Sequence, residues 1–122
     1  LINCSGTTTN STPKELFLDG GSSQRLTVPN NTSYVFTILI NGHRTDDVDA
    51  AAYQFLGMIS NRAGATAIVG SVTKNVVAET DSSWDADVTA DNTNDALVIT
   101  VTGATGKNIS WEAACWVAQV SS

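Results

Sequence analysis

The sequence predicts an all-β protein, and more specifically an antiparallel β-sandwich of the jelly-roll type. First, apolar and polar residues alternate with a period of two in several short segments, which is typical of strands with one buried face. Second, clusters of Gly, Pro, Asn and Asp separate these segments as turns. Third, signals for helices are almost absent. A chain of 122 residues is expected to form one domain with its own hydrophobic core.

The first third of the chain predicts a tether followed by three strands. Residues 1–13 are polar and end in a proline, which is the composition of a linker, so we expect the sandwich itself to comprise residues 14–122. Lys14–Leu18 and Gln24–Val28 are predicted as short strands on either side of a turn rich in Gly and Ser. Tyr34–Asn41 is dense in β-branched and aromatic residues and is predicted as a central strand.

Two interpretations compete for the segment that follows. Thr45 and the aspartates after it resemble the start of a helix, because short acceptors cap free backbone amides and carboxylates favour the positive end of the helix dipole. Tyr53 and Phe55, however, fall on one face of a strand. We therefore expect a loop as far as about Ala50 and a strand over Ala51–Asn61.

Four further strands are predicted at short, even spacing. In the third of them, apolar residues alternate with aspartate and threonine, which indicates an antiparallel sheet with one buried face. A loop rich in Asn and Asp joins the last two strands. The four predicted strands are Thr66–Val69, Val72–Ala78, Trp84–Ala90 and Ala96–Thr102.

The closing segment, Asn108–Val120, is predicted as a strand that is apolar on both faces. Such a strand has to be covered on both sides, yet the chain predicts almost no helices that could cover it. Each Trp in it can bury roughly 200 Å² of surface. We therefore expect one face to close the core and the other to contact further copies, as a homotrimer around an axis. The candidate oligomer interface is Ala114, Trp116, Ala118 and Val120, and the core-facing residues are Ile109, Trp111, Ala113, Cys115 and Val117.

Composition limits the partners that the chain can have. Its 12 acidic residues against 6 basic ones give a net charge of -6, which argues against nucleic acid and anionic membranes as partners. No apolar run approaches the roughly 20 residues that span a bilayer. Because the chain begins without Met, we expect it to be part of a longer protein. Cys4 and Cys115 are expected to be free, buried thiols, with a bridge between them as the alternative.

Residues for catalysis or metal binding are sparse. His43 is the only histidine, and no Gly-x-Ser-x-Gly elbow is present to support a Ser-His-Asp relay. Zinc would need three or four suitably spaced ligands. The loop Asp91–Asp95 lacks the glycine and closing glutamate of a calcium loop. Carboxylate pairs of glycosidases meet in space, so spacing leaves that alternative open. We expect a non-enzymatic protein without a cofactor or metal.

Several segments in the second half of the chain resemble one protein family. Asp81–Asp91, Asn94–Ile99, Val101–Lys107 and Ile109–Trp111 carry Trp, Gly and Asp in an order and at spacings similar to the C-terminal regions of tailed-bacteriophage tail fibre and tailspike proteins. The stretch Arg44–Gly57 resembles the start of the same module. The resemblance implies a trimeric all-β module at the end of a virion fibre, serving host attachment, trimer assembly or both.

A sugar site is one way in which such a module could attach to a host. Aromatic rings stack on the apolar face of a sugar while short polar groups bond its hydroxyls, and loops on a rigid sandwich commonly carry such sites. Tyr53 and Trp116 are the candidates for the ring, and one of them is expected to be exposed. The candidate polar residues are Asp91, Asn92, Asn94 and Asp95.

The leading hypothesis is therefore a receptor-binding domain at the tip of a bacteriophage tail fibre, made in the host cytoplasm and binding a glycan or protein of the bacterial surface. The first alternative is a structural module with no ligand of its own, either a trimerisation cap or a capsid fibre or decoration module. The second is a secreted bacterial carbohydrate-binding or adhesin module, which predicts a monomer with a sugar cleft within one chain.

Overall fold

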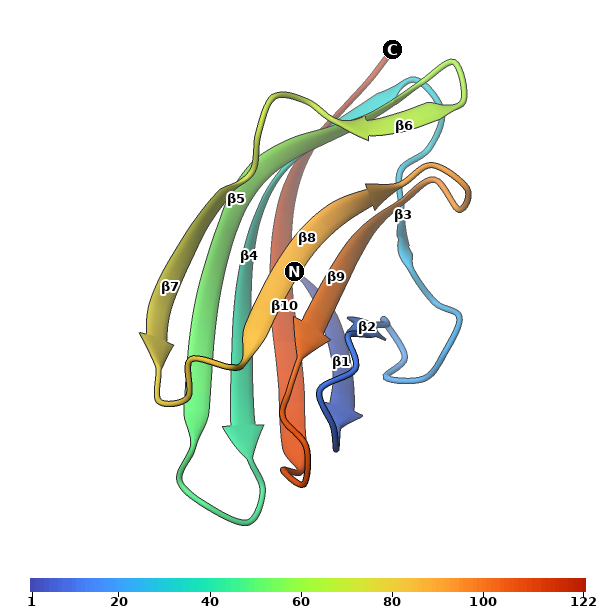
Figure 1. Cartoon of the computed structure of the whole chain (residues 1–122). Helices are drawn as coiled ribbons and strands as arrows, with labels where there is room; N and C mark the ends of the chain where they lie inside the picture. The colour runs from blue at the N-terminus through green and yellow to red at the C-terminus, as the bar shows by residue number, and fades with distance from the viewer.

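The computed structural model describes residues 1–122 and consists of strands without any helix, so no segment forms a helix that could cross a bilayer. The strands form a six-stranded and a four-stranded antiparallel sheet, which pack face to face (Figure 1). The expected antiparallel β-sandwich is confirmed. Its strands are β1 (Ile2–Thr8), β2 (Lys14–Leu16), β3 (Leu26–Thr27), β4 (Thr32–Arg44), β5 (Ala50–Arg62), β6 (Ala65–Ile68), β7 (Thr73–Glu79), β8 (Asp85–Asp91), β9 (Ala96–Thr102) and β10 (Ile109–Ser121).

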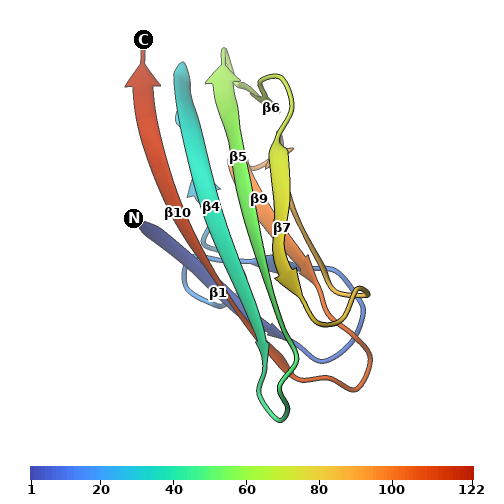
Figure 2. The ribbon, with the colours of Figure 1, turned by 90° about the vertical axis from the view of Figure 1, so that its left-hand side faces the viewer.

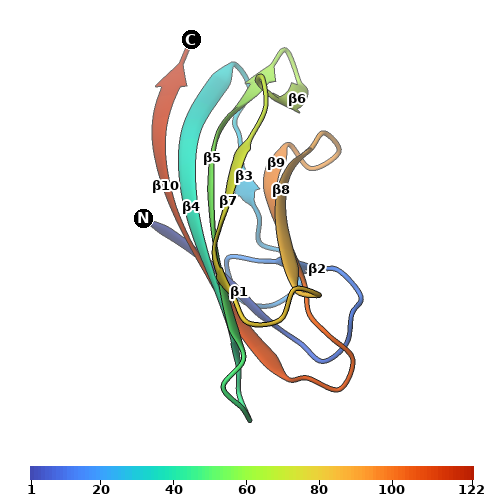
Figure 3. The same cartoon turned by 60° about the vertical axis from the view of Figure 1, so that its left-hand side comes forward.

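The six-stranded sheet, called the large sheet below, has the order β1-β10-β4-β5, and both β6 and β7 pair with β5. β4, β5 and β10 are 13 residues long and pair along nearly their full length. Together they form the long, curved centre of the large sheet (Figure 3). In the four-stranded small sheet, β2, β3 and β8 all pair with β9. β4, β5 and β7 are thus neighbours within the large sheet, whereas β8 and β9 form a hairpin in the small sheet.

The core lies between the two sheets, where alternate residues of the strands point inward. The rings of Trp84 and Trp111 meet there with centroids 5.8 Å apart. The indole nitrogen of Trp111 donates a buried hydrogen bond of 2.9 Å to the hydroxyl of Thr8. A Cβ atom on Gly42 would lie 2.4 Å from the Trp111 ring, so this position of β4 requires glycine. The ring of Trp111 therefore connects β10 to both of its neighbouring strands.

The expected tether at residues 1–13 is wrong for its first part, because Ile2–Thr8 form β1 at the edge of the large sheet. Thr favours strands, and Ile2, Cys4 and Thr8 point toward the core beside β10. The favoured state of the two cysteines, free and buried, is confirmed. Burial raises the pKa of both Cys4 and Cys115 to about 11.

The other predicted strands are present, with shifted ends. The interpretation of a loop before β5 is confirmed, since Thr45 and the aspartates after it form a turn rather than a helix. β4 begins two residues before Tyr34 and continues to Arg44, so it is longer than expected. β2 and β3 are shorter than predicted. The bounds of β9 agree with the prediction.

Candidate functional site

The outer face of the large sheet is covered by no other part of the chain (Figure 2). The small sheet packs on the opposite face only, while alternate side chains of β10, β4 and β5 point outward. Trp116 is 43% exposed, Leu56 on β5 is 53% exposed and Val120 is 70% exposed. The strand register places Trp116 and Leu56 on either side of Thr37 in one cross-strand row, and Val120 lies further along β10 beyond Ala118. We call this surface the outer patch; it consists of Val35, Leu39, Leu56, Met58, Ala114, Trp116, Ala118 and Val120.

No member of the outer patch is charged, and the charged side chains of this face lie toward its two ends. Glu112 lies one row beyond Ala114 on β10. Arg62 is the last residue of β5 and lies at the opposite end of the outer face. The patch is therefore an uncharged apolar surface on a protein whose net charge is -6. Contiguous exposed apolar surfaces of this kind mark sites of interaction with other molecules.

The edge of the large sheet beside the outer patch is also open. β1 pairs with β10 only from Ile109 to Cys115, so residues 116–121 have no strand on that side (Figure 2). The opposite edge, β7, is modified in two ways that discourage pairing. A register shift interrupts its pairing with β5 next to Tyr53, and Lys74 turns inward to bind Asp85. The free part of β10 has neither feature.

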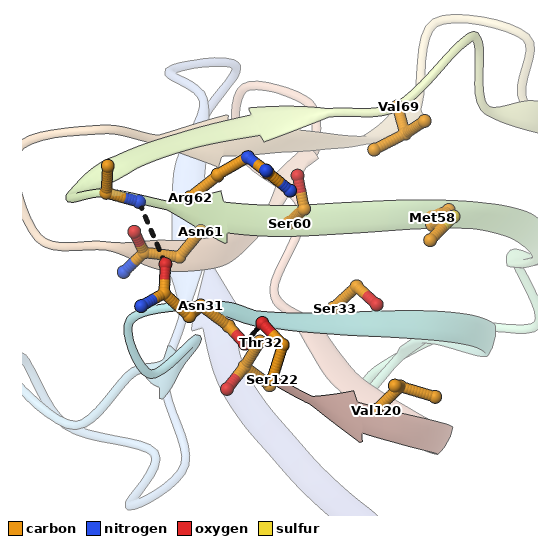
Figure 4. Close-up of a pocket in the computed structure, with 11 residues that line it drawn as sticks. Asn31, Thr32, Ser33, Met58, Ser60, Asn61, Arg62, Val69, Val120 and Ser122 are labelled. Atoms are coloured by element: carbon orange, nitrogen blue, oxygen red, sulfur yellow. Dashed lines mark hydrogen bonds between the residues drawn. The ribbon is translucent and has the colours of Figure 1, made fainter.

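A pocket of about 630 Å³ lies at the end of the outer face where β4 begins and β5 and β10 end (Figure 4). It adjoins the outer patch, because Met58 and Val120 belong to both. Hydroxyl and amide side chains predominate in its walls. Its lining residues are Asn31, Thr32, Ser33, Met58, Ser60, Asn61, Arg62, Ala63, Val69, Val120 and Ser122.

Side-chain hydrogen bonds hold the rim of the pocket in place. The amide oxygen of Asn31 accepts from the backbone N–H of Ala63 at 3.2 Å, and that of Asn30 accepts from Gly64 at 3.0 Å. These bonds join the start of β4 to the turn between β5 and β6. Asn31 and Ala63 both have left-handed backbones, with φ of 56° and 53°. Holding an alanine there costs on the order of 1 kcal/mol, so the rim is a constrained, preformed structure.

Arg62 gives the pocket a positive side-chain charge that no Asp or Glu side chain pairs with. Arg25, Arg44, Lys74 and Lys107 all form ion pairs, and Lys14 donates to a backbone carbonyl. Arg62 has no ion pair, and no acidic residue lines the pocket. Its side chain lies along β5 toward Ser60 (Figure 4).

Of the two candidate rings, Trp116 is exposed, whereas Tyr53 is 1% exposed and lies in the core. Its strand position explains this location, since it pairs with Ile40 of β4 on the face that meets the small sheet. Its hydroxyl donates to a carboxylate oxygen of Glu79 at 2.6 Å. Burial, and then this hydrogen bond, raise the pKa of Tyr53 well above its usual value. The residue is a structural tyrosine with a satisfied hydroxyl.

The loop between β8 and β9 is exposed, but its predicted ligand-binding groups already have partners within the protein. Asp91 accepts hydrogen bonds from the backbone and side chain of Asn94. Asn92 accepts from the backbone N–H of Thr66, and Asp95 accepts from the Thr66 hydroxyl, both at 2.8 Å. The loop is thereby fixed to β6. It is not assembled with Tyr53 into one site.

The opposite end of the sandwich carries a cluster of ion pairs that joins three loops. Lys107 lies 3.2 Å from Asp49 and 2.6 Å from Asp81, and Arg44 lies 2.7 Å from Asp46 and 3.4 Å from Asp49. The hydrogen bond from Lys107 is the largest cause that lowers the pKa of both Asp49 and Asp81. No group of three or more His, Cys, Asp or Glu side chains is arranged to hold a metal ion. The cluster serves to connect the loops.

The sequence predicts the position of the candidate interface residues but not the pocket. Ala114, Trp116, Ala118 and Val120 all lie on the outer face, as their alternation predicts. The pocket was not predicted. Its two rims come from separate turns of the chain, which the pairing of β4 with β5 brings together. No local sequence pattern predicts that these two turns lie side by side.

Comparisons with known proteins give a similarity among solved structures alone. No known protein family matches the sequence, and no curated protein matches it. Among solved structures, the chain is similar to the tailspike protein of Acinetobacter phage vB_ApiP_P1, with a TM-score of 0.39 and 13% sequence identity. The match covers 95% of this chain and 20% of that chain, so this chain spans one fifth of that tailspike. No activity, ligand or partner is taken over from it.

Proposed function

We propose that this chain is a non-enzymatic recognition domain at the tip of a bacteriophage tail fibre, which self-associates as a homotrimer and binds a glycan or protein of the host surface. The viral setting is supported by the sequence resemblance of residues 40–120. The single observation that carries self-association is the outer patch, with Trp116 exposed on a sheet face that its own chain leaves uncovered.

The chemistry of the outer patch favours further copies of the same chain as its partners. Chains with a net charge of -6 repel one another over most of their surfaces. At the outer patch, copies can approach without placing carboxylates together or burying an unpaired charge. A large aromatic side chain such as Trp116 on an apolar patch is typical of interface hot spots. Copies arranged around one axis also form a closed assembly, in which every copy makes the same contacts.

The mass of the protein in solution tests the assembly. Light scattering after size exclusion is expected to give three times the chain mass of 12.8 kDa. Trp116→Asp should weaken association at least about 30-fold, because truncating a hot spot costs about 2 kcal/mol or more. Val77→Asp is the matched control, since Val77 is 62% exposed on β7, outside the outer patch. A mass of one chain at every concentration would overturn the proposal.

Cell binding separates the proposed function from its alternatives. The fluorescently labelled domain is expected to bind host bacteria and to compete with intact virus. A structural trimerisation cap or a capsid decoration module would give the trimeric mass without binding to cells. A secreted bacterial adhesin or carbohydrate-binding module would be a monomer, and it would not compete with virus.

A further inference from the structure

We propose that the pocket at the end of the outer face binds an acidic saccharide, with Arg62 pairing the carboxylate and the surrounding hydroxyl and amide groups bonding the sugar hydroxyls. This inference rests on the proposed recognition function and names the class of ligand. The volume of the pocket, about 630 Å³, lies within the range of roughly 300–1,000 Å³ that is usual for small-molecule sites.

The unpaired guanidinium of Arg62 indicates a ligand with a negative charge. Among the six basic side chains, Arg62 alone makes neither an ion pair nor a hydrogen bond within the protein, although the chain has 12 carboxylates. A guanidinium presents paired donors that match a carboxylate. Because Arg62 is the one charged side chain among the lining residues and the whole protein is acidic, a ligand with one negative charge fits better than a phosphate monoester with nearly two.

The remaining walls favour a sugar as the carrier of that carboxylate. Ser33, Ser60 and Ser122 offer hydroxyls, which donate as well as accept hydrogen bonds. Met58 and Val69 provide apolar surface for the C–H groups of a sugar ring. Such a mixture of apolar surface and a few polar groups is typical of ligand sites. Since no aromatic ring lines the pocket, we expect the affinity for one sugar unit to be weak.

The site is built before the ligand arrives. The bonds of Asn30 and Asn31 to the turn between β5 and β6 hold both rims, and the pairing of Thr32 with Asn61 fixes their separation. A preformed site loses less conformational entropy on binding than a mobile loop does. The constrained backbone of Ala63 lies directly beside Arg62, which places the strain at the point of recognition.

Titration of the assembled protein with sodium glucuronate and with glucose tests the proposal, because these probes differ in the carboxylate. In NMR spectra, glucuronate is expected to shift residues 31–33, 60–63 and 120–122 and to bind at least about tenfold more tightly than glucose. Arg62→Gln should reduce glucuronate binding to the level of glucose. Lys14→Gln is the matched control, because it removes one positive charge from a side chain outside the pocket and should leave binding unchanged.

Several outcomes would overturn the inference. Equal binding of glucuronate and glucose would refute the role of charge, and equal effects of the two Gln variants would refute the role of Arg62. Inorganic phosphate that displaces glucuronate at equal concentration would show a general anion site. Cell binding by the same variants keeps the two proposals distinct. Glucuronate binding without cell binding refutes the proposed function alone, whereas cell binding that Arg62→Gln leaves intact shows that the pocket is not the receptor site.

Discussion

At the scale of single residues, Gly42 is the glycine at which an added Cβ atom would come closest to a neighbouring side chain, the ring of Trp111. The Trp111 ring lies where a side chain at position 42 of β4 would begin, and its indole nitrogen bonds Thr8 of β1 on the other side. The ring cannot move away without breaking that buried hydrogen bond. Overpacking at such a site cannot be relieved by a rotamer change.

Gly42→Ala is therefore expected to lower the free energy of unfolding by about 1–3 kcal/mol. The new methyl group would meet the Trp111 ring at 2.4 Å, so β4 or the ring has to shift. Chemical denaturation at a fixed chain concentration measures the effect, because the proposed association would also contribute to apparent stability. Asn41→Ala is the control, since Asn41 is exposed on the outer face of the same strand, and its effect should stay within about 0.5 kcal/mol. Equal effects of the two changes would contradict this account.

At the scale of strands, the sequence predicts elements well where alternation is strong. β8 alternates buried apolar residues such as Ala86 and Val88 with exposed aspartates, and its face was predicted correctly. β1 was missed because its inward positions include Gly6 and Thr8, which give little apolar contrast. What makes β1 a strand is its pairing with β10, about a hundred residues away in the sequence, and local patterns carry no signal for such a pairing.

In the candidate site, too, strand alternation predicts some features and misses others. Trp116 could be placed on the outer face because β10 is apolar on both sides and has two Trp residues of opposite parity. β5 also has apolar residues on both faces, so its alternation does not say whether Tyr53 or Leu56 points outward. The pocket depends on strand register, which is set by the whole sheet and not by the turns that form the rims.

The ion pairs that join the loops make stability depend on pH. In the folded state the pKa of Asp49 and that of Asp81 lie below the ordinary value of 3.8, first of all because Lys107 donates to both. A carboxyl whose folded pKa is lowered stabilises the fold above its unfolded pKa and loses that effect as pH falls through the folded value. The contribution of Lys107 should therefore be complete near pH 5 and fade as pH falls below about 4.

Lys107→Met is expected to lower the melting temperature at pH 5 to 7, with a difference from the wild type that shrinks steadily below pH 4. Thermal melts from pH 7 to pH 2 at constant ionic strength measure this convergence. Lys14→Met is the control, because Lys14 has no carboxylate partner and its effect should not change over this range. A constant difference between Lys107→Met and the wild type down to pH 2 would show that Lys107 acts by packing alone.

At the scale of the whole molecule, charge and apolar surface are separated. Apart from Glu79 on β7 and Glu112 on β10, the acidic residues lie on the loops and on the small sheet, and the outer patch of the large sheet has none. The pocket with Arg62 adjoins the patch at one end, so the proposed ligand would bind at the rim of the assembly rather than on its axis. The proposed association and the proposed ligand binding would thus use neighbouring surfaces of opposite physical character, one apolar and one ionic.

Raising the salt concentration should consequently change the two interactions in opposite directions. Between 50 mM and 500 mM NaCl, the screening length falls from more than 10 Å to a few Å, which weakens both repulsion between acidic chains and attraction at exposed ion pairs. Self-association should stay equal or tighten, because the outer patch contributes no charge and the net charge of -6 opposes assembly. Glucuronate binding should weaken, because it depends on Arg62. Sedimentation and NMR titration at both salt concentrations measure the two trends. Association that weakens with salt would mean that ion pairs, rather than the apolar face around Trp116, hold the copies together.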